Sequence, residues 1–119
     1  MSLLRPALAF AARYWLSLTL LILTAISYLS LAPLDQLPEA PGGDKLHHLA
    51  AYALLALPAA LARPGALPLI LCGFVAWGGL VELLQPYVNR YGELLDFIAN
   101  ALGVGIGAVL GTFARRSLH

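Results

Sequence analysis

Nine polar residues carry the possible chemistry of this otherwise apolar chain, and they come from three separate apolar segments. A charged group at the centre of a membrane-spanning helix costs about 2.5 to 3.5 kcal/mol on insertion scales. A chain that keeps several such groups in one layer has a binding or catalytic site there, or a polar network that braces its helices. The set comprises Asp44, Lys45, His48, Tyr52, Glu82, Gln85, Arg90, Asp96 and Asn100.

The spacing of the first four residues predicts one polar helix face. Asp44, His48 and Tyr52 are four residues apart, so they lie on the same side of a helix. Lys45 is three residues before His48 and adjoins that face. Asp44 also stands just before the second apolar run, where an N-cap is favoured.

Two later segments carry the remaining polar residues near their ends. Glu82 and Gln85 are three residues apart at the end of the third apolar run, and Arg90 follows in a short loop. Asp96 and Asn100 are four residues apart at the start of the fourth run, so they share a face. The three segments therefore aim their polar stripes at a common point near one membrane boundary.

Two kinds of chemistry fit these residue types. Arg90 and Lys45 suit phosphate or carboxylate oxygens, while acids and amides accept hydrogen bonds from sugar hydroxyls. Alternatively, His48 acts as general base or nucleophile, oriented by Glu82 or Asp96, so these three are the catalytic candidates. The two cations beside the acids disfavour a metal ion, and we predict neither a metal nor another cofactor.

The composition indicates a membrane protein. The chain has 119 residues, of which 61% are hydrophobic and 11% are charged, whereas soluble domains carry about 25% charged residues. A single soluble core of this size could not bury so much apolar surface. No basic run supports nucleic-acid binding.

Four apolar runs predict an all-α, polytopic protein with four transmembrane helices in a single domain over residues 1–119. Their lengths match the roughly 20 residues needed to cross the hydrocarbon layer. The first run is longer than a signal-peptide core, so we prefer a retained anchor helix to a cleaved leader. The predicted spans are about 14–32, 45–62, 67–85 and 94–114.

The distribution of Lys and Arg predicts the orientation. With four spans, five of these residues fall on the side of the termini, and Lys45 and Arg90 fall on the other side. The positive-inside rule then places both termini in the cytoplasm and the polar set at the extracytoplasmic face. The five are Arg5, Arg13, Arg63, Arg115 and Arg116.

Glycines predict close helix packing. Gly103, Gly107 and Gly111 form a ladder of small residues four apart on the fourth run. Packing within one chain is the simpler interpretation, and a homo-oligomer formed through this glycine-rich helix is the alternative. Gly78 and Gly79 on the third run also permit close approach.

The ordered set of motifs resembles the VanZ-like family of small integral membrane proteins. The resemblance covers roughly two-thirds of the chain, and the motifs are Asp44-Lys45-x-x-His48-x-x-x-Tyr52, Glu82-x-x-Gln85, Arg90 and Asp96-x-x-x-Asn100-x-x-Gly103-x-x-x-Gly107. The family is named after a member linked to teicoplanin resistance. The resemblance implies a multi-pass protein of the bacterial cytoplasmic membrane with a role in the cell envelope, and it supplies no reaction.

Three hypotheses about function follow. The polar set recognises a phosphate-bearing or glycosylated envelope lipid or precursor, with a link to glycopeptide resistance. Alternatively, the protein is an enzyme acting on a lipid phosphate through His48. In the third hypothesis, the set is a buried ionic network that only fixes helix register. The expected partner is a membrane lipid or an envelope precursor.

Overall fold

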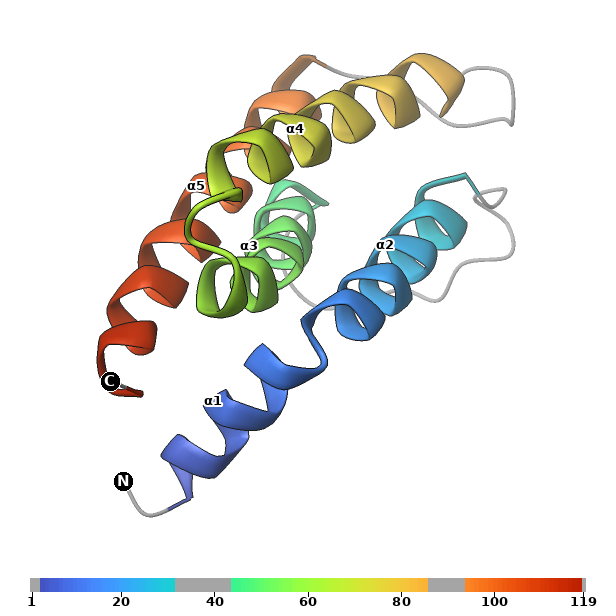
Figure 1. Cartoon of the computed structure of the whole chain (residues 1–119). Helices are drawn as coiled ribbons and strands as arrows, with labels where there is room; N and C mark the ends of the chain where they lie inside the picture. Colours follow the sequence, from blue (N-terminus) through green and yellow to red (C-terminus); the bar gives the residue numbers. More distant parts are fainter. Residues whose placement is uncertain (1–2, 32–43, 86–93, 119) are drawn as a thin grey trace.

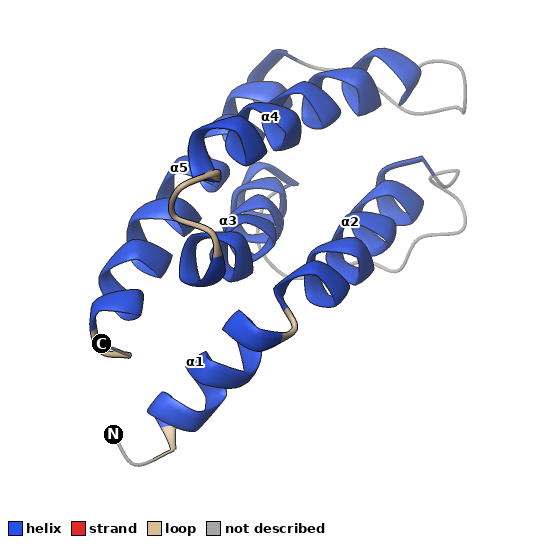
Figure 2. Cartoon of the chain, in the orientation of Figure 1, coloured by secondary structure: helices blue, strands red, loops and turns tan. Residues whose placement is uncertain are grey.

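The computed structural model describes residues 3–31, 44–85 and 94–118, and this part of the chain consists of helices joined by turns, with no strand (Figure 2). The all-α prediction is therefore confirmed for these residues. The helices are α1 (Leu4–Arg13), α2 (Trp15–Leu31), α3 (Asp44–Ala62), α4 (Leu67–Leu84) and α5 (Leu94–Arg116) (Figure 1).

Three helices are long and apolar enough to cross a membrane. They are the 18-residue segments Lys45–Ala62 and Leu67–Leu84 and the 23-residue segment Leu94–Arg116. At 1.5 Å per residue the longest extends about 34 Å, against about 30 Å of hydrocarbon. The bent pair α1 and α2 supplies a fourth crossing if it counts as one broken span. These findings agree with a polytopic membrane protein.

The first predicted span differs from the structure at its beginning. A separate helix, α1, precedes it, and α1 and α2 meet at an angle of 83°. The backbone leaves the helical conformation at Tyr14, with φ −105° and ψ 30°. The bend keeps Arg5 and Arg13 out of the apolar span, and α1 has no buried residue. Our prediction from the sequence included no helix here, although the segment is amphipathic.

The two ends of the helical bundle are held by different contacts. Trp15, at the start of α2, lies 5.9 Å from the guanidinium of Arg63 in the turn between α3 and α4. At the other end of α2, the carbonyl oxygen of Ser30 accepts a hydrogen bond of 3.0 Å from the Gln85 side chain. Thus α2 runs the length of the bundle, packed mainly against α3 and touching α4, and both termini lie at the Arg63 end (Figure 1).

The core of the bundle is the contact between α3 and α5, which is the most extensive in the molecule. A Cβ atom at Gly103 would fall on the carbonyl oxygen of Leu49, and one at Gly107 would fall on that of Ala53. At Gly111 it would lie 2.5 Å from the Cβ of Ala60. The glycine ladder thus faces α3 within the chain, so an oligomer built through α5 would have to use another face of it.

Candidate functional site

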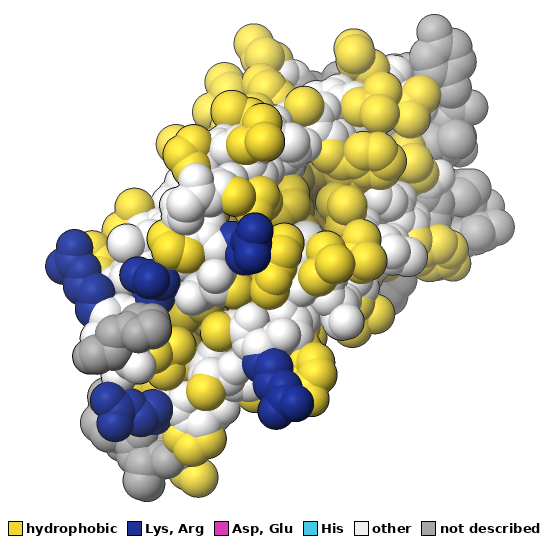
Figure 3. Space-filling view, viewed as in Figure 1, with side chains coloured by type: hydrophobic (Ala, Val, Ile, Leu, Met, Phe, Trp, Pro, Cys, Tyr) yellow, Lys and Arg dark blue, Asp and Glu magenta, His cyan; other side chains and the backbone are white. Residues whose placement is uncertain are grey.

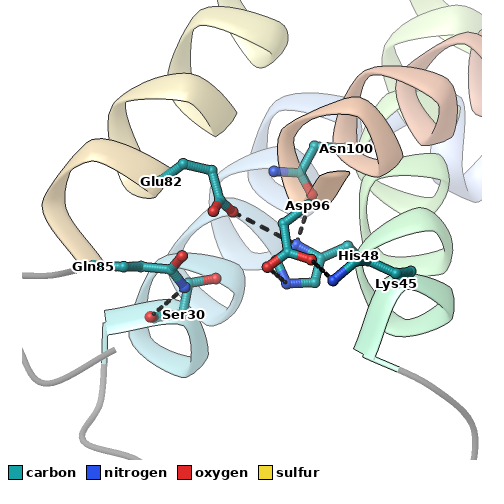
Figure 4. Close-up of polar contacts among 7 residues, drawn as sticks. All are labelled: Ser30, Lys45, His48, Glu82, Gln85, Asp96 and Asn100. Carbon is teal, nitrogen blue, oxygen red and sulfur yellow. Dashed lines mark hydrogen bonds and ion pairs between the residues drawn. The ribbon is translucent and has the colours of Figure 1, made fainter. Parts of the chain in front are cut away.

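His48 lies at the centre of a polar cluster that joins α3, α4 and α5 (Figure 4). Its Nδ1 atom is 2.7 Å from Oδ1 of Asn100 on α5. Because an amide oxygen only accepts hydrogen bonds, this orientation requires Nδ1 to carry the hydrogen. The Nε2 atom faces Oδ2 of Asp96 at 3.8 Å, and Oε1 of Glu82 lies 3.9 Å from Nδ1. One imidazole therefore contacts or faces three polar side chains from two neighbouring helices.

Lys45 and Asp96 form the shortest ion pair of the described residues. The Nζ atom lies 2.8 Å from Oδ1, and the Lys45 side chain is 42% exposed while Asp96 is buried. The pair joins the first turn of α3 to the first turn of α5. A partly exposed lysine side chain thus pairs with a buried carboxylate at the edge of the cluster.

Glu82 and Gln85 bring α4 into the same region. Both side chains are buried, and Glu82 points toward His48 (Figure 4). Gln85 is turned toward α2, where its Nε2 donates a hydrogen bond to the Ser30 carbonyl. The sequence did not identify Ser30, because a backbone carbonyl is present at every position and leaves no pattern.

Tyr52 lies one helical turn beyond His48 and is only 1% exposed. Its hydroxyl has no hydrogen-bond partner among the described residues, and the same holds for Nδ2 of Asn100 and Oε1 of Gln85. Gly78 on α4 makes room for this arrangement, because a Cβ there would lie 3.2 Å from Nδ2 of Asn100 and 3.4 Å from the Tyr52 ring. A buried polar atom without a partner costs about 1 to 3 kcal/mol, so a polar group that reached these atoms would be stabilised by them.

Two members of the predicted set cannot be placed. Arg90 lies outside the described residues, and Asp44 is described as the first residue of α3 but its side chain is not. Their roles stay predictions. The other seven members all lie at the same end of the helices, and four of them, His48, Glu82, Asp96 and Asn100, are within side-chain reach of one another.

Three side chains are close enough to contact one metal ion. His48, Glu82 and Asp96 each offer a ligand atom, and these atoms lie within 4.8 Å of one another. Histidine with carboxylates is a ligand set found for zinc and other transition metals. However, the Lys45 ammonium lies 2.8 Å from Asp96 and already compensates one of the two negative charges. A divalent ion would have to compete with that ammonium.

An apolar groove adjoins the polar cluster. It has a volume of about 580 Å³ between α4 and α5. Among the described residues, Glu82 is the one charged residue of the lining, and it also belongs to the cluster around His48. The apolar lining residues gave no functional signal in the sequence, because they are indistinguishable there from lipid-facing or core residues. They are Ala76, Gly79, Leu80, Leu83, Leu94 and Phe97.

Chemically, the cluster combines acceptors, donors and one candidate base. The carboxylates of Glu82 and Asp96 accept hydrogen bonds, the Asn100 amide and Tyr52 hydroxyl can donate them, and His48 can move a proton. No serine or cysteine belongs to the predicted set.

Comparison of the chain with protein-family models, with curated proteins and with solved structures gives no match in any of the three. The resemblance to the VanZ-like family therefore rests on the order and spacing of the motifs alone.

Proposed function

We propose that the protein recognises an amphipathic lipid of the cell envelope. In this proposal the lipid chain lies in the groove between α4 and α5, and the polar headgroup contacts the cluster around His48. The observation that carries the proposal is the continuity of the two regions through Glu82, which lines the apolar groove and faces the imidazole. A ligand with one apolar and one polar part matches such a surface.

The described polar groups favour a headgroup rich in hydroxyls. Glu82 and Asp96 would accept hydrogen bonds from hydroxyls, and the buried Tyr52 hydroxyl and Asn100 Nδ2 would gain partners. A sugar supplies several hydrogen-bond donors and acceptors. A glycosylated envelope lipid or precursor is therefore the preferred ligand class.

A phosphate on the same ligand would be held by cations. Among the described residues, Lys45 is the cation of the cluster; its ammonium pairs with Asp96, and its side chain is 42% exposed. Arg90 is the second cation that the sequence predicts there. The sequence predicts that Lys45 and Arg90 together bind a phosphate. Because Lys45 neutralises one of two buried carboxylates, phosphate recognition would depend mainly on Arg90.

Catalysis by His48 is the second candidate function. It is favoured by the hydrogen bond from Nδ1 to Asn100, which would orient the ring, and by Asp96, which faces Nε2 at 3.8 Å. A general base held in this way could activate water or a hydroxyl against a lipid phosphate. The third hypothesis, a purely structural network, accounts for the Lys45–Asp96 pair but gives no role to the unpartnered Tyr52 hydroxyl.

The membrane setting completes the proposal. Five arginines at the end with the termini favour a cytoplasmic location for that end, so the polar cluster would face the outside of the bacterial cytoplasmic membrane. A role in the envelope, including glycopeptide resistance of the VanZ type, would be consistent with a site in that position.

Native mass spectrometry of the gently extracted protein tests the proposal. Gly79→Leu fills the groove, because even a Cβ at Gly79 lies 3.2 Å from the Phe97 ring. Gly73→Leu is the matched control on the same helix, since a Cβ there meets nothing within 4 Å. We expect the wild type and the Gly73 variant to retain one selected lipid class and the Gly79 variant to lose it.

An unselected lipid mixture on all three proteins would contradict lipid recognition. A retained lipid then separates binding from catalysis. Incubation of that lipid with the protein should change its mass if a bond is broken, and His48→Gln should stop the change while the lipid stays bound. No mass change with the wild type would leave recognition as the function and remove the catalytic alternative.

A further inference from the structure

Four arginines line a second groove, at the opposite end of the molecule from the polar cluster. This groove has a volume of about 900 Å³ and is lined by Arg5, Arg13, Arg63 and Arg115, together with Trp15 and neighbouring apolar residues. Figure 3 shows the basic side chains gathered at the end with the termini, with no acidic side chain visible on that face. Among the described residues, the charged side chains that line this groove are therefore all positive.

The four arginines come from three distant parts of the chain. Arg5 and Arg13 lie at the two ends of α1, Arg63 lies in the turn after α3, and Arg115 lies in the last turn of α5. The 83° bend between α1 and α2 determines the direction of α1, which carries two of them. The positive-inside rule explains why arginines flank the spans, but it does not require them to converge on one groove.

Protein contacts hold two of these side chains in place. Arg5 donates hydrogen bonds of 2.7 and 3.1 Å to the carbonyl oxygen of Ser117, which ties α1 to the end of α5. The Arg63 guanidinium lies 5.9 Å from the centre of the Trp15 ring. The groove is thus formed by ordered elements.

No carboxylate of the described residues pairs with these arginines. The ion pairs among the described residues all involve Lys45 or His48, which lie at the other end of the molecule. Arginine stays charged at every accessible pH, so the groove keeps four positive charges close together. An anion that binds between them would relieve their repulsion, and the guanidinium fork suits the oxygens of a phosphate.

The surroundings of the groove favour a lipid as the source of that anion. On α1, Leu4 and Phe10 are exposed beside the arginines, and Tyr14 and Trp15 follow. A helix with exposed apolar residues, basic residues and adjacent aromatics is typical of the membrane interface. Arginines that flank membrane spans are expected at the depth of the lipid headgroups.

We propose that this groove binds the phosphate of an anionic phospholipid in the leaflet next to the termini. The proposal concerns a separate site from the cluster around His48. The lipid phosphate bridges α1, the α3–α4 turn and α5, so it also fixes α1 against the bundle. Basic residues near a membrane surface contribute about a factor of five each to the affinity for anionic lipid.

The test uses the full chain in lipid nanodiscs or detergent, with phosphatidylglycerol as probe and phosphatidylcholine as the zwitterionic control. Arg115→Gln removes a groove arginine. Arg116→Gln is the matched control, because it removes the same charge from the next residue, which lies over the Phe113 ring and outside the groove lining. Arg63→Gln provides a second groove variant on an exposed turn.

We expect each groove variant to weaken phosphatidylglycerol binding in native mass spectrometry about fivefold, and Arg116→Gln to change it less than twofold. An equal loss for Arg115→Gln and Arg116→Gln would overturn the proposal in favour of general surface charge. Equal retention of phosphatidylcholine would overturn it as well. Complete displacement of the lipid by millimolar inorganic phosphate would show a free-anion site and would also contradict it.

Discussion

Replacing Gly107 with alanine tests the contact that positions the polar cluster. The added Cβ would fall on the carbonyl oxygen of Ala53, which is backbone and cannot rotate away. Helices α3 and α5 would have to move apart, and overpacking of this kind costs about 1 to 3 kcal/mol. Alanine also gains about 0.5 to 1 kcal/mol over glycine in a helix interior, and this gain opposes the cost.

Gly105→Ala is the control that isolates the clash. Gly105 lies on the same helix, and a Cβ there meets nothing within 4 Å. Both variants have the same gain in helix propensity. The difference between their free energies of unfolding therefore measures the cost of the clash at Gly107. We expect Gly107→Ala to be about 1 to 3 kcal/mol less stable than Gly105→Ala.

Reversible unfolding in mixed detergent micelles, followed by tryptophan fluorescence, measures this difference. Equal stability of the two variants, or a more stable Gly107 variant, would refute the close approach of α3 and α5. Gly103→Ala extends the test to the site. Its Cβ would fall on the Leu49 carbonyl, next to His48 in the chain, so this variant should also lower lipid retention.

Three further predictions concern the site and the topology. Tyr52→Phe removes a buried hydroxyl that lacks a partner among the described residues, so it should leave the free energy of unfolding unchanged or raise it by about 1 kcal/mol while lipid retention falls. His48→Ala should accumulate normally in membranes if the cluster is a working site, whereas a loss of about 3 to 5 kcal/mol would indicate a bracing network. A periplasm-active reporter fused after Arg116 should stay inactive, and strong activity there would reverse the proposed orientation.

The helices and the meeting of the polar residues could be predicted from the sequence because both follow from periodicity. Apolar runs of membrane-spanning length mark α3, α4 and α5, and spacings of three and four residues place His48, Glu82 and Asn100 on inward faces. Because successive helices run in opposite directions, the polar ends of α3, α4 and α5 then lie at one end of the bundle. The glycine ladder likewise marks the face of α5 that contacts α3.

Other features depend on packing and left no pattern. The bend at Tyr14 arises from one backbone conformation, which the neighbouring residue types do not dictate. The pairing of Lys45 with Asp96 could not be chosen from the sequence, because Glu82 was an equally available acid. The groove beside Phe97 is lined by apolar side chains whose direction is known only once α4 and α5 are packed.

A high-resolution structure of the protein with its co-purified lipid tests the central claim most directly. We expect an acyl or prenyl chain beside Phe97 and a headgroup atom within hydrogen-bond distance of the Tyr52 hydroxyl or Asn100 Nδ2. A structure with no ordered chain in that groove, and with both polar groups bonded only to water or to other protein groups, would contradict it.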